Sequence, residues 1–267
     1  MTGPKILVFD IETAPMISYM WRMWKETIGI NQIESDWYIL CWCAKWVGEK
    51  KIHKAALPDF PTYYKKHPES DKAILAPLWD LINEADILVT HNGNRFDIPK
   101  TNSRFLVNGM NPPAPSKSVD TYQIARHKFG FTSNKLDYIG QHLGLGKKKE
   151  TGGFKLWRDC LKGDPTAWKK MVRYNMQDVN LLEKVYIKLR PWARTHPVFS
   201  LYCDDEEIRC HRCGSTNLSP NGSVMTAAGQ YKRYHCNDCG AWPRGRVNML
   251  AGKAGKPKRE NTLINIV

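Results

Sequence analysis

The stretch Lys5-Ile6-Leu7-Val8-Phe9-Asp10-Ile11-Glu12-Thr13 decides how the rest of the chain is interpreted. A short apolar run ends in two carboxylates one residue apart. If the run is a strand, its side chains alternate between two faces, so Asp10 and Glu12 leave the same face. Two negative charges held that close repel each other, and partial burial increases the cost. The pair is either a solvated strand end or half of a cation site, and the second interpretation requires further acids elsewhere in the chain.

The charge balance favours a polyanionic partner. The 267 residues include 40 Lys and Arg against 26 Asp and Glu, a formal net charge of +14. Such an excess favours nucleic acid, although a solvated basic surface produces the same number. The 10 Trp and 11 Tyr can supply rings on which bases stack. The strand-like spacing of Trp37, Trp42 and Trp46 predicts instead that these three belong to the core.

The N-terminal residues and the cysteines indicate a cytoplasmic protein without a membrane partner. Residues 1–5 lead directly into the first strand and lack the pattern of a signal peptide. No apolar run approaches the roughly 20 residues that cross a bilayer. Thiols stay reduced in the cytosol, so the eight cysteines suggest metal binding before disulfides.

Alternating strand and helix patterns predict an α/β fold in which helices flank a mixed sheet. Three antiparallel strands come first, and a helix, a strand, a helix, a strand and further helices follow. Residues 14–36 show no clear periodicity and receive no assignment. The expected strands are 5–11, 37–47, 51–56, 86–90 and one ending at Asp120, and the expected helices include 71–84, 97–109, 134–143 and 164–189.

The composition changes near residue 203, where Cys, Gly, Asn and Arg become frequent. We therefore expect one domain with a full hydrophobic core over residues 1–202 and a small metal-binding module over 203–250. Residues 251–267 begin as a basic, flexible linker and end in a short apolar tail.

Two further acids and a tyrosine extend the carboxylate pattern. Asp97 follows the strand at 86–90, and Tyr174 lies four residues before Asp178 on the longest helix, so both face the same way. Three segments carry a family resemblance: Phe9-Asp10-Ile11-Glu12-Thr13, then His91-Asn92-Gly93 with Phe96-Asp97, then Tyr174-x-x-x-Asp178. Together they resemble the DEDDy subgroup of the ribonuclease H-like 3′-to-5′ exonucleases, a superfamily that includes the proofreading domains of DNA polymerases. The resemblance covers roughly residues 5–190.

The resemblance implies a two-metal phosphodiesterase site. Four carboxylates offset the charge of two dications, and hard oxygen ligands select Mg²⁺ or Mn²⁺. Two such ions roughly 3.5–4 Å apart stabilise both the attacking and the leaving oxygen. By this resemblance, Tyr174 would orient the attacking water. The implied catalytic residues are Asp10, Glu12, Asp97, Tyr174 and Asp178, of which the four acids hold the metals.

Other residues near these motifs have weaker assignments. Thr13 and Asn92 are expected to contact the terminal nucleotide, and Phe96 either wedges against the terminal base or packs in the core. Asp97 could also cap its helix. Asp120 follows a strand and is the best rival for a metal ligand, but its neighbours do not match the metal motifs, so we expect a structural role, as for His91.

Two Cys-x-x-Cys-Gly segments predict a structural zinc site. Four thiolates from Cys210, Cys213, Cys236 and Cys239 match a closed tetrahedral site for one Zn²⁺, and the trailing glycines allow the tight turns. The module resembles a zinc ribbon, which needs the metal because so short a segment has little core. Cys41, Cys43, Cys160 and Cys203 lack such spacing and are expected in the core or without a role.

A basic and aromatic strand lies between the two cysteine pairs. Tyr231, Lys232 and Arg233 combine a ring for stacking with cations for phosphates, which suits single-stranded nucleic acid. Arg244 and Arg246 would extend that face. A protein-docking surface is the alternative.

The resemblance, together with the basic zinc module, implies a metal-dependent 3′-to-5′ exonuclease acting on single-stranded or frayed DNA, and the direction of cleavage comes from the resemblance alone. The same chemistry on RNA is the close alternative, because fold does not set substrate. A non-catalytic nucleic-acid-binding adaptor is a third, although a scaffold has little reason to keep four acids and Tyr174. A replication or repair protein is a further candidate partner.

Overall fold

The computed structural model describes residues 3–147, 152–227 and 229–251. The chain forms two compact units, an N-terminal unit over Lys5–Leu189 and a C-terminal unit that begins at Arg190 and includes Gly3 and Pro4. The N-terminal unit contains β1 (Ile6–Thr13), β2 (Ile17–Ser18), β3 (Ile33–Ser35), β4 (Ile39–Trp46), β5 (His53–Ala56), α1 (Pro61–Lys66), α2 (Lys72–Glu84), β6 (Ile87–Thr90), α3 (Asp97–Val107), β7 (Lys117–Asp120), α4 (Thr121–Lys128), α5 (Leu136–His142), α6 (Lys155–Leu161) and α7 (Pro165–Leu189), and the C-terminal unit contains β8 (Leu218–Thr226) and β9 (Gly229–Cys236).

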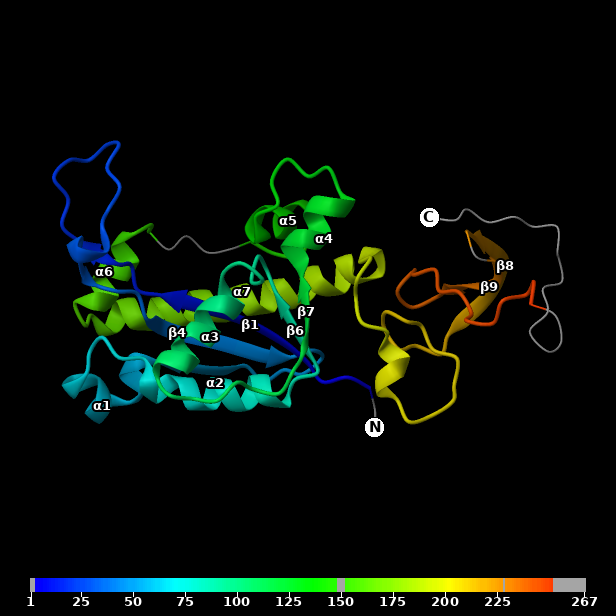
Figure 1. Ribbon diagram of the computed structural model, residues 1–267, viewed down its shortest axis with the longest axis horizontal. Helices are drawn as coiled ribbons and strands as arrows, with labels where there is room; N and C mark the ends of the chain where they lie inside the picture. The colour runs from blue at the N-terminus through cyan, green and yellow to red at the C-terminus, as the bar shows by residue number, and fades with distance from the viewer. Residues whose placement is uncertain (1–2, 148–151, 228, 252–267) are drawn as a thin grey trace. The chain divides into compact units, whose positions relative to one another are not determined.

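A five-stranded mixed sheet organises the N-terminal unit, in the order β5-β4-β1-β6-β7 (Figure 1). The central strand β1 pairs antiparallel with β4 and parallel with β6. β4 pairs antiparallel with β5, and β6 parallel with β7. The predicted antiparallel start and the mixed α/β class are therefore confirmed. Because β1 is buried between neighbours on both edges, its end is a rigid place from which to present side chains.

The alternation of side chains along β1 places the two N-terminal acids on the α7 side of the sheet. Leu7, Phe9 and Ile11 belong to one buried cluster, which includes the apolar face of α2. Val8 belongs to the other, with Val179, Leu182 and Val185 of α7. Asp10 and Glu12 continue the Val8 face by the two-residue period of a strand. The long helix thus covers the face that carries both acids (Figure 1).

The tryptophan-rich region differs from expectation in two places. Trp42 is buried and Trp46 packs against the core, as predicted. Trp37, however, precedes β4 and lies outside the core, where the Lys100 ammonium sits 3.4 Å from its ring centroid. The unassigned residues 14–36 form a two-stranded antiparallel ribbon, β2 with β3, and the loop that joins them.

α1 and α6 were not predicted, because each is too short to establish a periodic pattern.

The C-terminal unit begins earlier than residue 203, where the composition changes. Arg212, between the first two cysteines, donates to the backbone carbonyls of His196 at 2.7 Å and Arg194 at 3.3 Å. The segment after α7 therefore packs with the cysteine module. Of the predicted linker and tail, residues 252–267 lie outside the described part of the chain. In that described part, no helix is both long enough and apolar enough to cross a bilayer.

Candidate functional site

Three carboxylates from distant parts of the sequence meet at the end of β1. Oxygens of Asp10, Glu12 and Asp178 all lie within 4.8 Å of one another. The first two come from the end of β1, and α7 presents Asp178 onto the same face of the sheet. Asp178 is buried, while Asp10 and Glu12 are half-buried. Three hard oxygen donors at this separation fit a divalent cation such as Mg²⁺ or Mn²⁺, because the positive charge offsets repulsion that burial strengthens.

Asp97 stands beside this group without belonging to it. It begins α3, it is buried, and its Oδ1 accepts the backbone N–H of Ile11 at 3.1 Å. Ile11 separates Asp10 from Glu12, so the contact ties the fourth predicted acid directly to the strand that carries the first two. Burial raises the pKa of Asp97 to about 7, against the opposing effect of the Ile11 hydrogen bond. A carboxyl that resists ionisation near neutrality is readily converted to a carboxylate by a nearby cation.

Asn175 is a member of the site that the sequence patterns missed. Its Nδ2 donates to Asp10 Oδ2 at 2.6 Å, and the side chain is fully buried. The contact orients the Asp10 carboxylate from the helix that also carries Asp178. The available signal was positional, because Asn175 lies three residues before Asp178 and shares its helix face. An asparagine there could equally have been solvent-facing, and only the packing of α7 on β1 distinguishes the two.

Tyr174 is half-buried on α7, one turn before Asp178. Its ring lies edge-on to that of Trp157 on α6, with the centroids 6.5 Å apart. α6 thus supports the tyrosine ring. Residues 148–151, which precede this helix in the sequence, lie outside the described part of the chain. The contact restrains the position of the Tyr174 ring on α7.

The turn after β6 is held by Asp120, which explains that residue without a metal. Asp120 Oδ1 accepts the N–H of Asn92 at 2.8 Å and of Tyr122 at 3.0 Å, and Oδ2 accepts the N–H of Asn94 at 3.3 Å. Asn92 adopts a left-handed backbone, φ 65°. The hydrogen bonds from the Asn92 and Asn94 N–H groups to Asp120 stabilise this turn. His91 bridges Thr121 and the Asn134 carbonyl, both at 2.9 Å. Both residues therefore hold the turn between β6 and α3, and Asp97 begins α3.

Thr13 and Phe96 adjoin predicted metal ligands in the sequence. Thr13 ends β1 at a register shift against β4, directly after Glu12. Phe96 immediately precedes Asp97 and remains 38% exposed, so it does not pack in the core. Of the two roles expected for Phe96, its exposure argues against packing in the core.

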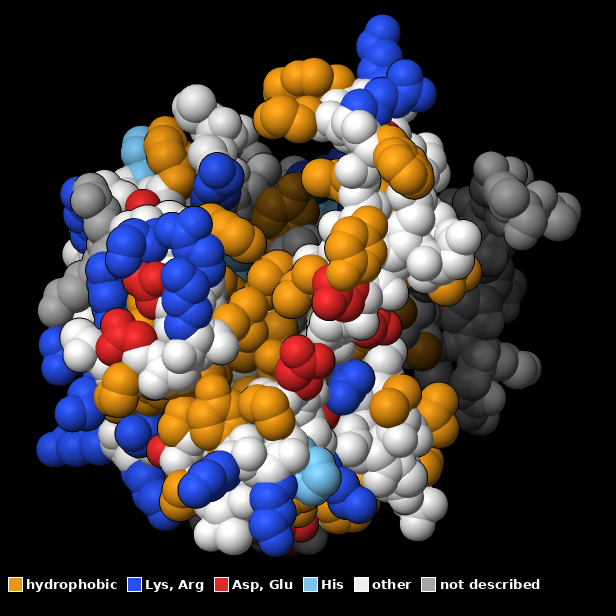
Figure 2. Space-filling view, turned by 90° about the vertical axis from the view of Figure 1, so that its left-hand side faces the viewer, with side chains coloured by type: hydrophobic (Ala, Val, Ile, Leu, Met, Phe, Trp, Pro, Cys, Tyr) orange, Lys and Arg blue, Asp and Glu red, His pale blue; other side chains and the backbone are white. Residues whose placement is uncertain are grey.

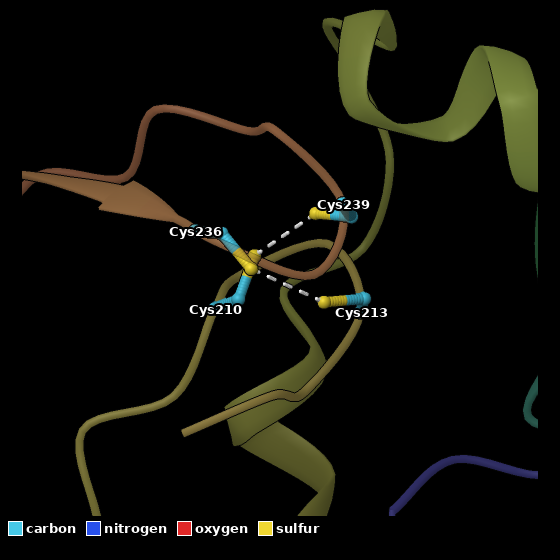
Figure 3. A group of neighbouring side chains, drawn as sticks. All are labelled: Cys210, Cys213, Cys236 and Cys239. Carbon is cyan, nitrogen blue, oxygen red and sulfur yellow. Dashed lines mark hydrogen bonds between the residues drawn. The ribbon is translucent and has the colours of Figure 1, made fainter. Parts of the chain in front are cut away.

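The four predicted cysteines converge in the C-terminal unit (Figure 3). Sulfur–sulfur distances are 3.6 Å for Cys210 with Cys239 and for Cys213 with Cys236. The glycine after each pair has a positive φ, 79° at Gly214 and 77° at Gly240, as the tight turns require. The corresponding bonds, from the Gly214 and Gly240 N–H groups to the carbonyls of Cys210 and Cys236, are both 2.9 Å.

This geometry fits a tetrahedral Zn²⁺. A zinc–sulfur bond of roughly 2.3 Å places tetrahedral ligands roughly 3.8 Å apart, close to the separations seen, whereas a disulfide needs roughly 2.05 Å. A hydrogen bond from the Cys213 thiol is the largest cause that lowers the pKa of Cys210. Hydrogen bonds from the backbone N–H groups of Arg212 and Cys213 to the same sulfur lower it further. A stabilised thiolate is the form that binds metal. Cys41, Cys43 and Cys160 are buried in the N-terminal unit, as expected.

The basic strand residues divide between the two faces of β9. Lys232 lines a cavity of about 550 Å³ together with Tyr234, Arg244 and Arg246. Tyr231 lies under the Arg244 guanidinium, 4.1 Å from its ring centroid. The Arg233 guanidinium instead bonds the Asn221 carbonyl at 3.0 Å and the Asn221 side chain at 3.1 Å. Of the three strand residues, Lys232 therefore lines the cavity, and Tyr231 contacts Arg244, which lines it too. The described hydrogen bonds of Arg233 lie within the unit.

Comparison with known proteins places this chain in a family. The sequence matches the RNase_H superfamily over residues 25–190, which is more than half of its length. The chain belongs to the RNase_H superfamily. The matched region contains Asp97, Tyr174 and Asp178, whereas Asp10 and Glu12 precede it. Membership supports nuclease activity in general, and with it a nucleic-acid substrate.

A solved structure shows the same fold in a much larger protein. The family B DNA polymerase from the hyperthermophilic archaeon Pyrobaculum calidifontis superposes with a TM-score of 0.52 and 17% identity. The match covers 70% of this chain and 25% of the polymerase. A comparison with curated proteins gives no match. At this identity the likeness establishes the fold, and the site residues have to be argued from their own geometry.

Proposed function

We propose that the protein is a metal-dependent 3′-to-5′ exonuclease that removes nucleotides from single-stranded or frayed DNA. The observation that carries the proposal is the meeting of Asp10, Glu12 and Asp178 within 4.8 Å, with Asp97 hydrogen-bonded to the strand between the first two. Those acids are the oxygen donors that divalent cations prefer. The direction of cleavage rests on the resemblance of the three motifs to DEDDy exonucleases.

Each residue of the site has a part in the proposed reaction. Asp10, Glu12, Asp97 and Asp178 would hold two Mg²⁺ or Mn²⁺ ions, which supply an activated water and stabilise the leaving oxygen. Tyr174, braced by Trp157, orients the attacking water through its hydroxyl. Asn175 keeps the Asp10 carboxylate turned toward the site. Thr13, Asn92 and Phe96 contact the terminal nucleotide.

The C-terminal unit, as we propose, is a zinc ribbon that grips the nucleic acid. One Zn²⁺ on the four cysteines would hold the fold, and the cavity lined by Lys232, Arg244 and Tyr234 would offer cations to phosphates and a ring to a base. Removing the unit should weaken binding and flatten its salt dependence, since fewer counterions are released. Unchanged affinity would favour a protein-docking role, for instance toward a replication or repair protein.

The proposal is tested by digesting 5′- and 3′-labelled DNA and RNA, single- and double-stranded, with Mg²⁺ or Mn²⁺. We expect mononucleotides to leave the 3′ end of single-stranded DNA first. The likeness to a DNA polymerase makes DNA the first substrate to test, and faster digestion of RNA would instead identify an exoribonuclease. Release from the 5′ end would contradict the assignment.

The site assignment is tested separately by Asp10→Ala, with Asp80→Ala as the matched control. Asp80 is an exposed acid on α2, so its loss removes the same charge away from the acidic group. We expect Asp10→Ala to abolish nucleotide release while the protein stays folded and binds DNA, and Asp80→Ala to cleave as the wild type does. Cleavage retained by Asp10→Ala would refute the site.

A further inference from the structure

The loop between β2 and β3 displays large apolar side chains to solvent. Trp21 is 94% exposed and Trp24 is 78% exposed, although tryptophan is usually mostly buried. Arg22 and Lys25 lie among these rings and are exposed too. Figure 2 views the end of the molecule from which this loop projects, and hydrophobic and basic side chains crowd the surface there. The other exposed apolar residues of the segment are Met16, Ile17, Tyr19, Met20, Met23, Ile28 and Ile30.

The loop backbone is organised by polar contacts rather than by collapse of these rings. The Glu26 carboxylate accepts the N–H groups of Trp21 at 3.2 Å and Arg22 at 2.8 Å. These two hydrogen bonds lower the pKa of Glu26, so the braces persist at neutral pH. Gln32 links the two sides, because its Nε2 donates to the Tyr19 carbonyl at 3.1 Å and its Oε1 accepts the Gly29 N–H at 2.7 Å. Glu26, Gln32 and backbone groups thus hold the loop together, while the tryptophan rings stay exposed.

The base of the β2–β3 ribbon lies close to the acidic site. β2 follows β1 after only three residues, so the loop leaves the chain at the strand end that carries Glu12. On its return, the chain reaches Trp37, whose ring lies 3.4 Å from the Lys100 ammonium. The same ammonium lies 5.2 Å from the ring of Phe96, the neighbour of Asp97. A path of rings and cations therefore runs from the acids to the base of the ribbon.

We infer that the 19–25 loop is a binding surface for the single-stranded nucleic acid that enters the acidic site. The inference rests on the proposed function. Sequence-independent binding of single strands combines aromatic rings, on which bases stack, with cations that meet the backbone. The loop provides Trp21 and Trp24, with Arg22 and Lys25 beside them. These cations favour a partner with phosphates, because a purely apolar partner would gain nothing from them. It would hold the strand several nucleotides from the scissile bond.

The test compares Trp21→Ala/Trp24→Ala with Trp21→Phe/Trp24→Phe, which keeps two stacking rings. Both full-length variants are assayed on single-stranded DNA of 2 to 20 nucleotides and on the p-nitrophenyl ester of thymidine 5′-monophosphate. Stacking contributes roughly 1–3 kcal/mol per base, so the alanine variant should bind 20-mers at least about 20-fold more weakly than wild type. The phenylalanine variant should keep most of the affinity. Neither should change hydrolysis of the small ester, which is too short to reach the loop.

The outcomes separate the inference from the proposed function. A loss that grows with strand length and spares the ester supports the loop as a nucleic-acid surface. Equal cleavage and binding of 20-mers by wild type and the alanine variant would overturn it, and light scattering that shows a wild-type dimer lost in that variant would assign the rings to self-association. If the wild type hydrolyses neither the ester nor any strand, the proposed function itself fails.

Discussion

Asn175→Asp is the sharpest test of how the acidic site is assembled. The substitution places a carboxylate oxygen where an amide nitrogen now donates to Asp10 Oδ2 at 2.6 Å. Two charges roughly 3 Å apart repel by about 5 kcal/mol at an effective dielectric constant near 20. Asn175 is fully buried and Asp10 is half-buried, so water reaches the contact only from the Asp10 side. A donor would thus become a competing anion without any change in side-chain size.

The cost should depend on pH, because protonating one carboxyl removes the repulsion. Holding an ordinary carboxyl of pKa about 3.9 protonated costs about 1.36 kcal/mol per pH unit above that value. At pH 5 this relief limits the loss to about 1.5 kcal/mol, whereas at pH 8 the full repulsion of about 5 kcal/mol applies. The raised pKa in the folded variant means that the native state binds more protons, so its stability falls as pH rises.

The measurement is urea unfolding of wild type and variant at pH 5 and pH 8, without added Mg²⁺ or Mn²⁺ and with zinc retained. Far-UV circular dichroism follows the helices of the N-terminal unit. Asn180→Asp is the matched control, because it adds the same charge to α7 but faces Lys45, whose ammonium lies 3.3 Å from Asn180 Oδ1. The control should lose little stability at either pH. Wild-type stability of Asn175→Asp at pH 8 would refute the buried contact with Asp10, and saturating Mg²⁺ should restore the variant more than the wild type.

Two further predictions concern the C-terminal unit. Gly240→Ala should lower the stability of the unit by about 1–2 kcal/mol, the strain of a left-handed backbone, because nothing lies within 4 Å of the added carbon. Gly214→Ala should lower it clearly more, because the added carbon would lie 2.3 Å from the Phe199 ring. Zinc release during thermal unfolding measures both, and equal losses would contradict the packing of Phe199 on the cysteine turn. Burial lowers the pKa of His196 to about 4, so the folded unit resists protonation that the unfolded chain accepts. Stability should fall by about 1.6 kcal/mol between pH 6.5 and 5, and urea unfolding of zinc-saturated His196→Gln should lack this part of the fall.

Much of the fold was predictable because its signals are local. The apolar runs of β1, β4 and β6 and the long periodic pattern of α7 each lie within one stretch of sequence. The two Cys-x-x-Cys-Gly turns are equally local, since the glycine needed for a positive φ stands next to the cysteine it serves. The ribbon at residues 14–36 escaped prediction because its order comes from single polar residues such as Glu26, which create no period.

The boundary between the two units shows the limit of composition as a guide. Composition changes near residue 203, but the packing boundary falls at Leu189. Arg212 reaches back to the His196 and Arg194 carbonyls, and a β-carbon at Gly214 would meet Phe199. Such contacts join residues that share no pattern, so only their positions in space reveal them.

The sequence by itself determined that Asp10 and Glu12 leave one face of a strand, because side-chain alternation follows from backbone geometry alone. It also determined the donor chemistry, oxygen in one site and sulfur in the other. Only the tertiary structure decided that Asp178 completes the acidic group, that Asp97 stands one hydrogen bond away, and that Asn175 orients Asp10. Those relations depend on how α7 and α3 pack against β1, and packing between elements distant in sequence has no local signature.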